Sequence, residues 1–124
     1  MPRHSGVAFA EKLDFISGMG HVPHRRAGRG VNYLITDLGE FDWAEGRMRL
    51  IRYHPGVTED QIRRKTGFEI DVAPDVHETE PPSPAELDLL RNTIDPLGVR
   101  RLETLGGSAR KDLLREILRA ENAF

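Results

Sequence analysis

Residues 31–70 constrain the fold of this chain more than any other part of it. They read VNYLITDLGEFDWAEGRMRLIRYHPGVTEDQIRRKTGFEI. Runs of β-branched and aromatic residues predict a buried strand at residues 31–38 and a pair of strands on either side of a turn at residues 45–46. A helix at residues 58–66 and an alternating run at residues 69–73 follow. This order predicts an α/β fold, in which helices pack on a sheet.

Capping residues mark the starts of three helices. Thr58 is the predicted N-cap of the first helix, and Gln61 lies at the third helical position, where a capping box needs it. Ser83 opens a second helix in the same way, with a proline at the first helical position. Ser108 can cap a third helix, whose leucines and isoleucine form one apolar face.

The segment before this stretch predicts one more strand. Residues 7–16 alternate, with apolar side chains on both faces, which is typical of a strand that is covered on both sides. With this strand included, we expect an open, largely parallel sheet with packed helices over residues 1–105. A C-terminal helix is expected over residues 106–124.

Composition excludes several classes of protein. The sequence has no cysteine, which removes disulfides, zinc–thiolate sites and cysteine nucleophiles. The net charge of −2 gives no electrostatic reason to expect nucleic acid or an anionic membrane as a partner. No apolar run approaches the roughly 18 residues of a membrane span, and charged residues interrupt any signal-peptide core. We expect a soluble, cytoplasmic protein.

Two loops hold the candidate site residues. Gly18 and Gly20 follow the predicted strand at residues 7–16, and a loop of small residues can present backbone N–H groups to an anion or simply form a tight turn. His21 and His24 supply only two ligands, whereas a zinc site needs three or four, so no metal site is predicted.

His54 and Gly56 lie in the second loop, between a strand end and a helix cap. In open α/β sheets such junctions often face the ligand crevice. The alternative is that His54 and Pro55 fix the turn and hydrogen-bond locally. Elsewhere no serine has a clear His/Asp setting. The carboxylates Asp37, Glu40 and Asp42 suit turn or edge positions as well as acid–base chemistry. No catalytic residue is therefore assigned.

VNYLITDLGEFDW, joined to MRLIRYHPGVTEDQIRRKTGFE, resembles the C-terminal half of the B (beta) subunit of family I CoA-transferases. The similarity is to the glutaconate CoA-transferase branch of these B subunits, which also includes steroid-ring-cleaving CoA-thioester hydrolases. The 3-oxoacid CoA-transferases share the layout more loosely. AEKLDFISGMGH resembles the strand and Gly-rich loop of that branch, and ETEPPSPAELDLLRNTIDPLGVRR resembles its C-terminal extension. The resemblance covers residues 7–101.

This resemblance implies a partial CoA-transferase-like domain that pairs with an A (alpha) subunit. It also implies a reaction in which a glutamate carboxylate attacks an acyl-CoA thioester, and CoA then passes to a carboxylic acid. Coenzyme A thioester would be the substrate of the intact enzyme, with no bound cofactor. By resemblance, Gly18, Gly20 and His21 border the CoA or acyl site, and His54 and Gly56 come next.

The nucleophilic glutamate of these enzymes lies in a Ser-Glu-Asn-Gly-like motif in several branches, and this sequence has no such motif. Its one Glu-Asn pair, Glu121-Asn122, is followed by Ala123. We therefore expect a piece of a longer subunit that is inactive alone. Two alternatives stay open: a non-catalytic interaction domain that binds an A-type subunit or itself as a homo-oligomer, and a small anion-binding module that uses the loop at residues 18–29.

Overall fold

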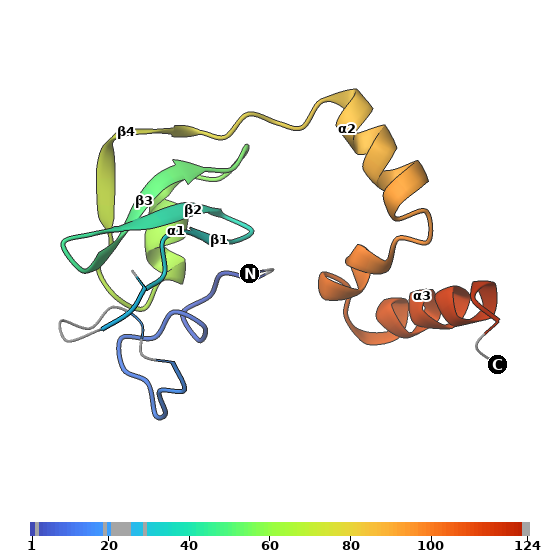
Figure 1. The fold of residues 1–124 in the computed structure, drawn as a ribbon, viewed down its shortest axis with the longest axis horizontal. Helices are drawn as coiled ribbons and strands as arrows, with labels where there is room; N and C mark the ends of the chain where they lie inside the picture. The colour runs from blue at the N-terminus through green and yellow to red at the C-terminus, as the bar shows by residue number, and fades with distance from the viewer. Residues whose placement is uncertain (2, 19, 21–25, 29, 123–124) are drawn as a thin grey trace. The chain divides into compact units, whose positions relative to one another are not determined.

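The computed structural model describes residues 1, 3–18, 20, 26–28 and 30–122 (Figure 1). The chain forms two compact units, Met1–Glu80 and Pro81–Phe124, and each is described by itself. These units are defined by internal contacts and do not test the domain boundary predicted between residues 105 and 106, which stays a prediction.

A four-stranded sheet organises the first unit. Its strands lie in the order β1-β2-β3-β4. β1 pairs with β2 and β2 with β3 in antiparallel fashion, whereas β3 and β4 are parallel. The bounds are β1 Leu34–Ile35, β2 Gly39–Ala44, β3 Arg47–Tyr53 and β4 Asp71–Glu78, with α1 at Glu59–Lys65 between β3 and β4.

The α/β fold and the open sheet are thus confirmed, but the pairing is mixed rather than largely parallel. Short turns connect β1 to β2 and β2 to β3, and a short turn can only return the chain antiparallel. The connection through α1 is long enough for a parallel crossover. At the predicted turn, Glu45 and Gly46 both have positive φ, 53° and 79°, as a tight hairpin turn requires.

α1 begins where the capping residues predict. The Thr58 side chain accepts a hydrogen bond from the backbone N–H of Gln61 at 3.2 Å. Ile62 is fully buried and packs into the main core of the unit. The buried members of this core are Phe9, Leu38, Phe41, Met48, Leu50, Ile62 and Ile70.

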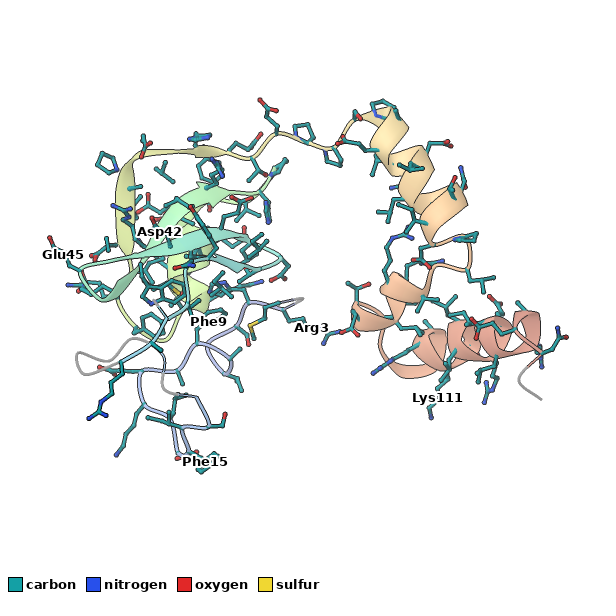
Figure 2. The ribbon with its side chains drawn as sticks, in the orientation of Figure 1. Arg3, Phe9, Phe15, Asp42, Glu45 and Lys111 are labelled. Atoms are coloured by element: carbon teal, nitrogen blue, oxygen red, sulfur yellow. The ribbon has the colours of Figure 1, made fainter. Side chains whose placement is uncertain are left out.

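The strand predicted at residues 7–16 is absent from the described structure. A single bridge pairs Ala10 with Gly67. Phe9 turns toward the sheet and is buried, but Phe15 points away from it and is 81% exposed (Figure 2). At residues 31–38, too, only two residues form a strand. β1 is the edge of the sheet, and residues 7–16 do not add to this edge as a further strand.

Buried His4 anchors the N-terminal segment, and nothing in the sequence pattern marked it. Its backbone N–H donates to Asp37 Oδ1 at 2.6 Å. Its ring lies 3.2 Å from the Thr36 hydroxyl and 2.9 Å from the Thr66 hydroxyl, and it stacks on Phe9 with 3.9 Å between ring centroids. One imidazole therefore joins the N-terminal segment to the sheet and to the end of α1.

The His4 environment predicts a pH-dependent stability. Burial lowers the pKa of His4; Asp37 opposes this shift, and Lys65 adds to it. The unfolded chain, with an ordinary histidine pKa of about 6.5, then binds the proton more readily than the folded chain. The contribution of neutral His4 to the free energy of unfolding is complete at pH values above this ordinary pKa and is lost as the pH falls below it.

We therefore expect the free energy of unfolding to decrease between pH 7 and pH 5. The same titration with His4→Phe, which keeps an aromatic ring on Phe9, is expected to give a shallower slope. Urea unfolding at a series of pH values measures both slopes, and equal slopes would contradict this origin of the pH dependence.

The second unit is helical. Its elements are α2 Pro84–Asp88, a π-helical continuation η1 Leu89–Ile94, a 3-10 helix η2 Val99–Glu103, and α3 Gly107–Ala120. The capping box at Ser83 is confirmed: Ser83 Oγ accepts from the Glu86 N–H, and Glu86 Oε2 accepts from the Ser83 N–H. α3 begins one residue before Ser108, with Gly106 as its N-cap. In the described part of the chain, no helix has the length and apolar character to cross a membrane.

Candidate functional site

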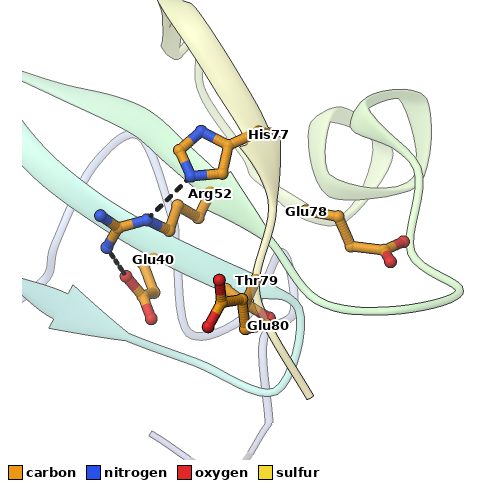
Figure 3. Close-up of a pocket in the computed structure, with 6 residues that line it drawn as sticks. All are labelled: Glu40, Arg52, His77, Glu78, Thr79 and Glu80. Atoms are coloured by element: carbon orange, nitrogen blue, oxygen red, sulfur yellow. Dashed lines mark hydrogen bonds and ion pairs between the residues drawn. The ribbon is translucent and has the colours of Figure 1, made fainter.

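A pocket lies where the parallel strands β3 and β4 end. Arg52 pairs with His77 and Tyr53 with Glu78, so the carboxyl ends of the two strands meet at one edge of the sheet. Ligands bind outside this edge in open α/β sheets. The pocket has a volume of about 440 Å³ and is lined by Glu40, Arg52, His77, Glu78, Thr79 and Glu80 (Figure 3).

Arg52 holds one wall of this pocket together across three strands. Its Nη1 donates to Glu40 Oε2 at 2.8 Å, and its Nε donates to His77 Nε2 at 3.3 Å (Figure 3). His77 Nδ1 lies 2.8 Å from the backbone oxygen of Asp75, which can only accept. In this arrangement Nδ1 donates to the Asp75 oxygen and Nε2 accepts from Arg52. The strand register explains the row, since Arg52 lies opposite Glu40 on one side and His77 on the other.

The charge of the pocket is negative. Three glutamates line it against one arginine. The side chains of Glu78 and Glu80 form no hydrogen bond or ion pair with any residue that the structure describes. Such carboxylates can bind a cation or accept a proton, but they repel a polyphosphate. The pocket therefore suits a cationic or hydrogen-bond-donating group better than an anion.

His54, predicted from sequence, lies directly behind this pocket. Its Nδ1 is 3.0 Å from the hydroxyl of Thr79, a wall residue, and its Nε2 is 3.0 Å from the backbone oxygen of Thr36. Its backbone N–H donates to Leu38 O at 3.0 Å. Both ring nitrogens are engaged, so His54 ties the end of β4 to the turn before β2. These ring contacts reach residues 25 and 18 positions away in the chain, and whether His54 also borders a CoA or acyl site stays a prediction.

Gly18, Gly20 and Gly56 are not among the residues that line the described pockets. Gly56, in the turn before α1, has a φ of 78°, and Gly20 has a φ of 50°. A Cβ added at Gly18, Gly20 or Gly56 would meet nothing within 4 Å. His21, like His24, lies outside the described residues. That these residues border a CoA or acyl site stays a prediction.

Sequence reasoning missed most of the pocket residues. Of the six, only Glu40 was considered for chemistry. The signal that could have identified Arg52 and His77 is their place near the ends of two adjacent strands, but the pairing of those strands was needed to use it. Among the described residues, no group of three or more His, Asp or Glu side chains is arranged to hold a metal ion.

Comparison with known proteins finds similarity to B subunits of a ring-cleaving hydrolase and of CoA-transferases. The IpdB subunit of the cholesterol ring-cleaving hydrolase of Rhodococcus jostii is 32% identical over 108 residues, which are 82% of this chain and 43% of that protein. The B (beta) subunit of glutaconate CoA-transferase from Acidaminococcus fermentans is 33% identical over 106 residues, 77% of this chain and 40% of that protein. No protein-family model matches the chain.

Solved structures agree with the sequence comparison. The Rhodococcus jostii IpdAB structure superposes with a TM-score of 0.69 at 32% identity, covering 82% of this chain and 44% of the other. The glutaconate coenzyme A-transferase of Acidaminococcus fermentans gives a TM-score of 0.68 at 30% identity, covering 76% and 40%. At these identities the likeness is one of homology as well as of fold.

The fold is therefore that of a partial CoA-transferase-like α/β domain. The chain is related to the B subunits of CoA-transferases and of cholesterol ring-cleaving hydrolases. It spans about two fifths of the length of these curated relatives, 43% and 40%. The relatives are B subunits of paired A and B assemblies, as in IpdAB and the decarboxylase AibA/AibB.

Proposed function

We propose that this chain is a segment of a B-type subunit of an enzyme that moves CoA between an acyl-CoA thioester and a carboxylic acid. The observation that carries the proposal is the joint match of sequence and fold to the B subunit of glutaconate CoA-transferase, over 77% of the chain in sequence and 76% in structure. An A-type subunit is the proposed partner, and the CoA thioester is the substrate of the intact assembly.

We further propose that the chain catalyses no transfer by itself. The sequence lacks the Ser-Glu-Asn-Gly-like motif. In the described pocket at the ends of β3 and β4, the Glu40 carboxylate is held in an ion pair with Arg52, and no pocket carboxylate is assigned a nucleophilic role. The role that remains is scaffold, together with one wall of a site that other residues complete.

A thioester-exchange assay tests this proposal. The purified chain is incubated with acetyl-CoA and either glutaconate or 3-oxoadipate, and the CoA thioesters are separated by chromatography. We expect no exchange, and no mass increase of CoA on the protein. When the tagged chain is expressed in its native cells, we expect it to co-purify with an A-type subunit identified by mass spectrometry. Exchange by the chain alone would overturn its proposed inactivity.

A non-catalytic interaction domain is the second candidate, and one observation favours it. The first unit leaves large apolar side chains exposed, and contiguous exposed apolar surface marks interaction sites in soluble proteins. These side chains, each more than half exposed, are Val7, Leu13, Phe15, Ile16, Tyr33 and Ile35. Such a domain would bind an A-type subunit or a second copy of itself.

Light scattering on a sizing column tests the self-association. We expect the chain to associate at micromolar concentration, and we expect Phe15→Ser with Tyr33→Ser to shift it to the monomer, because both side chains are mostly exposed and their replacement removes no core contact. Arg64→Ser, on the exposed face of α1, is the control and is expected to change nothing. A wild-type chain that is monomeric at all concentrations would count against this candidate.

A further inference from the structure

The second unit contains a basic pocket that the proposed function does not use. It has a volume of about 490 Å³ and lies where η1 ends and η2 begins. Arg91, Asp95, Pro96, Leu97, Gly98, Arg100 and Arg101 line it. Three of these residues are cationic and one is anionic, which is the opposite of the pocket at the ends of β3 and β4.

Asp95 fixes the shape of this pocket. Its carboxylate accepts from the backbone N–H groups of Val99 at 2.7 Å and Arg100 at 3.1 Å, and from Arg100 Nη1 at 2.6 Å. Burial alone would raise the pKa of this carboxyl, but these hydrogen bonds and the Arg100 charge hold it below its usual value. Asp95 is therefore an internal anion that closes the turn and neutralises Arg100.

Two guanidinium groups of the pocket are left without a counter-charge. The side chains of Arg91 and Arg101 form no hydrogen bond or ion pair with residues that the structure describes. The Arg101 side chain lies against Gly98, where an added Cβ would come within 3.2 Å of its Cδ. Gly98 itself has a φ of 68°, a conformation that favours glycine. The backbone thus leaves room for Arg101 at the pocket wall.

An exposed arginine is ordinarily solvated and needs no ligand. Here two unpaired arginines line one concavity, and local hydrogen bonds hold the turn between them. Guanidinium groups match the geometry of phosphate oxygens and bind them with charge-assisted hydrogen bonds. A doubly negative group would compensate both charges at once.

We infer that this pocket binds a terminal phosphate dianion, with Arg91 and Arg101 as its ligands and the Asp95-stabilised turn as the support. The inference stands apart from the proposed function, because it concerns the second unit and needs no thioester chemistry. The same chemistry is offered by free inorganic phosphate and by the 3′-phosphate of coenzyme A. Dephospho-CoA lacks that phosphomonoester and distinguishes the two sources.

Amide NMR titrations of the full chain test the inference at constant ionic strength. Inorganic phosphate, CoA and dephospho-CoA are each added, and we expect saturable shifts at Gly98, Val99, Arg100 and Arg101. Arg91→Ala with Arg101→Ala is expected to weaken phosphate binding at least tenfold. Arg110→Ala with Arg119→Ala makes the same change of charge on α3, outside the pocket, and is expected to leave the affinity within twofold.

Each result decides the matter. Loss of binding in the pocket variant but not in the α3 variant supports the site. If CoA binds more tightly than dephospho-CoA, the ligand phosphate is that of CoA; if the two are equal while phosphate still binds, the ligand is a phosphate from another source. No saturable shift with 20 mM phosphate, or equal weakening in both variants, would overturn the inference. The thioester assay is unaffected by either outcome.

Discussion

Phe41→Ala is expected to destabilise the first unit by about 3–5 kcal/mol, which is the usual cost of removing a large aromatic side chain from a packed core. Phe41 lies in β2, is completely buried and belongs to the main core cluster. Its ring is also tilted against the His4 ring, with 5.4 Å between centroids. Since small domains have a total stability of about 5–15 kcal/mol, this loss would remove a substantial part of it.

Phe15→Ala is the matched control for this prediction. It deletes the same atoms from a side chain that is 81% exposed, and we expect a change within about 0.5 kcal/mol. Urea unfolding followed by the circular dichroism of the sheet measures both variants. Similar losses in the two variants would mean that the core does not lie where the structure puts it.

The sequence predicted those elements whose signals are local. The hairpin turn needs two residues with positive φ, and a Glu-Gly pair between strand-forming runs indicates such a turn. The caps at Thr58 and Ser83 are likewise read from residues three positions apart. Ser83 forms both bonds of its capping box, whereas at Thr58 the described structure has only the bond from the Gln61 N–H to the Thr58 side chain. Such features are recognised from neighbouring residues, so they can be predicted without knowledge of distant contacts.

The failures concern segments whose state depends on a distant partner. Residues 7–16 alternate like a strand, but a strand needs a neighbour with free backbone groups, and only Ala10 finds one, at Gly67. His4 is a second example. Its burial depends on Thr36, Thr66 and Phe9 together, and no period in the sequence connects these positions.

The residues of the candidate site also divide into those with a local sequence signal and those that depend on distant contacts. Sequence placed His54 at a junction of the kind that faces ligands, and the structure puts it against Thr79, a wall residue of the pocket. The row formed by Glu40, Arg52 and His77 required the register of three strands, one of them reached by the crossover through α1. A parallel pairing across a helix leaves no local mark in sequence.

The fold alone does not determine which reaction an enzyme of this architecture catalyses. Related chains of this architecture belong to a ring-cleaving hydrolase, to CoA-transferases and to the decarboxylase AibA/AibB, which superposes with a TM-score of 0.52 at 33% identity. One scaffold therefore carries several chemistries, and the residues set into it decide among them. The proposed subunit type therefore rests on the shared fold, whereas the proposed inactivity of the chain alone rests on the Ser-Glu-Asn-Gly-like motif that the sequence lacks.

Gly67→Ala is expected to release the N-terminal segment from the rest of the first unit. The backbone N–H of Gly67 donates to Phe9 O at 2.7 Å, and a Cβ at this position would come within 2.5 Å of the same oxygen. The Phe9 oxygen belongs to the backbone and the Cβ is fixed directly on it, so neither atom can rotate away. Overpacking of this kind costs about 1–3 kcal/mol. The cheapest relief is for residues 1–10 to move off the end of α1, which would expose His4 and Phe9.

Hydrogen exchange would then show faster exchange at Phe9 and Gly67 while β2 and β3 keep their protection, and limited proteolysis would cut first within residues 1–16. Gly6→Ala is the control, because a Cβ there meets nothing within 4 Å. If Gly67→Ala matched that control, the N-terminal segment would not pack against the end of α1, and the burial of His4, together with the pH dependence derived from it, would lose its basis.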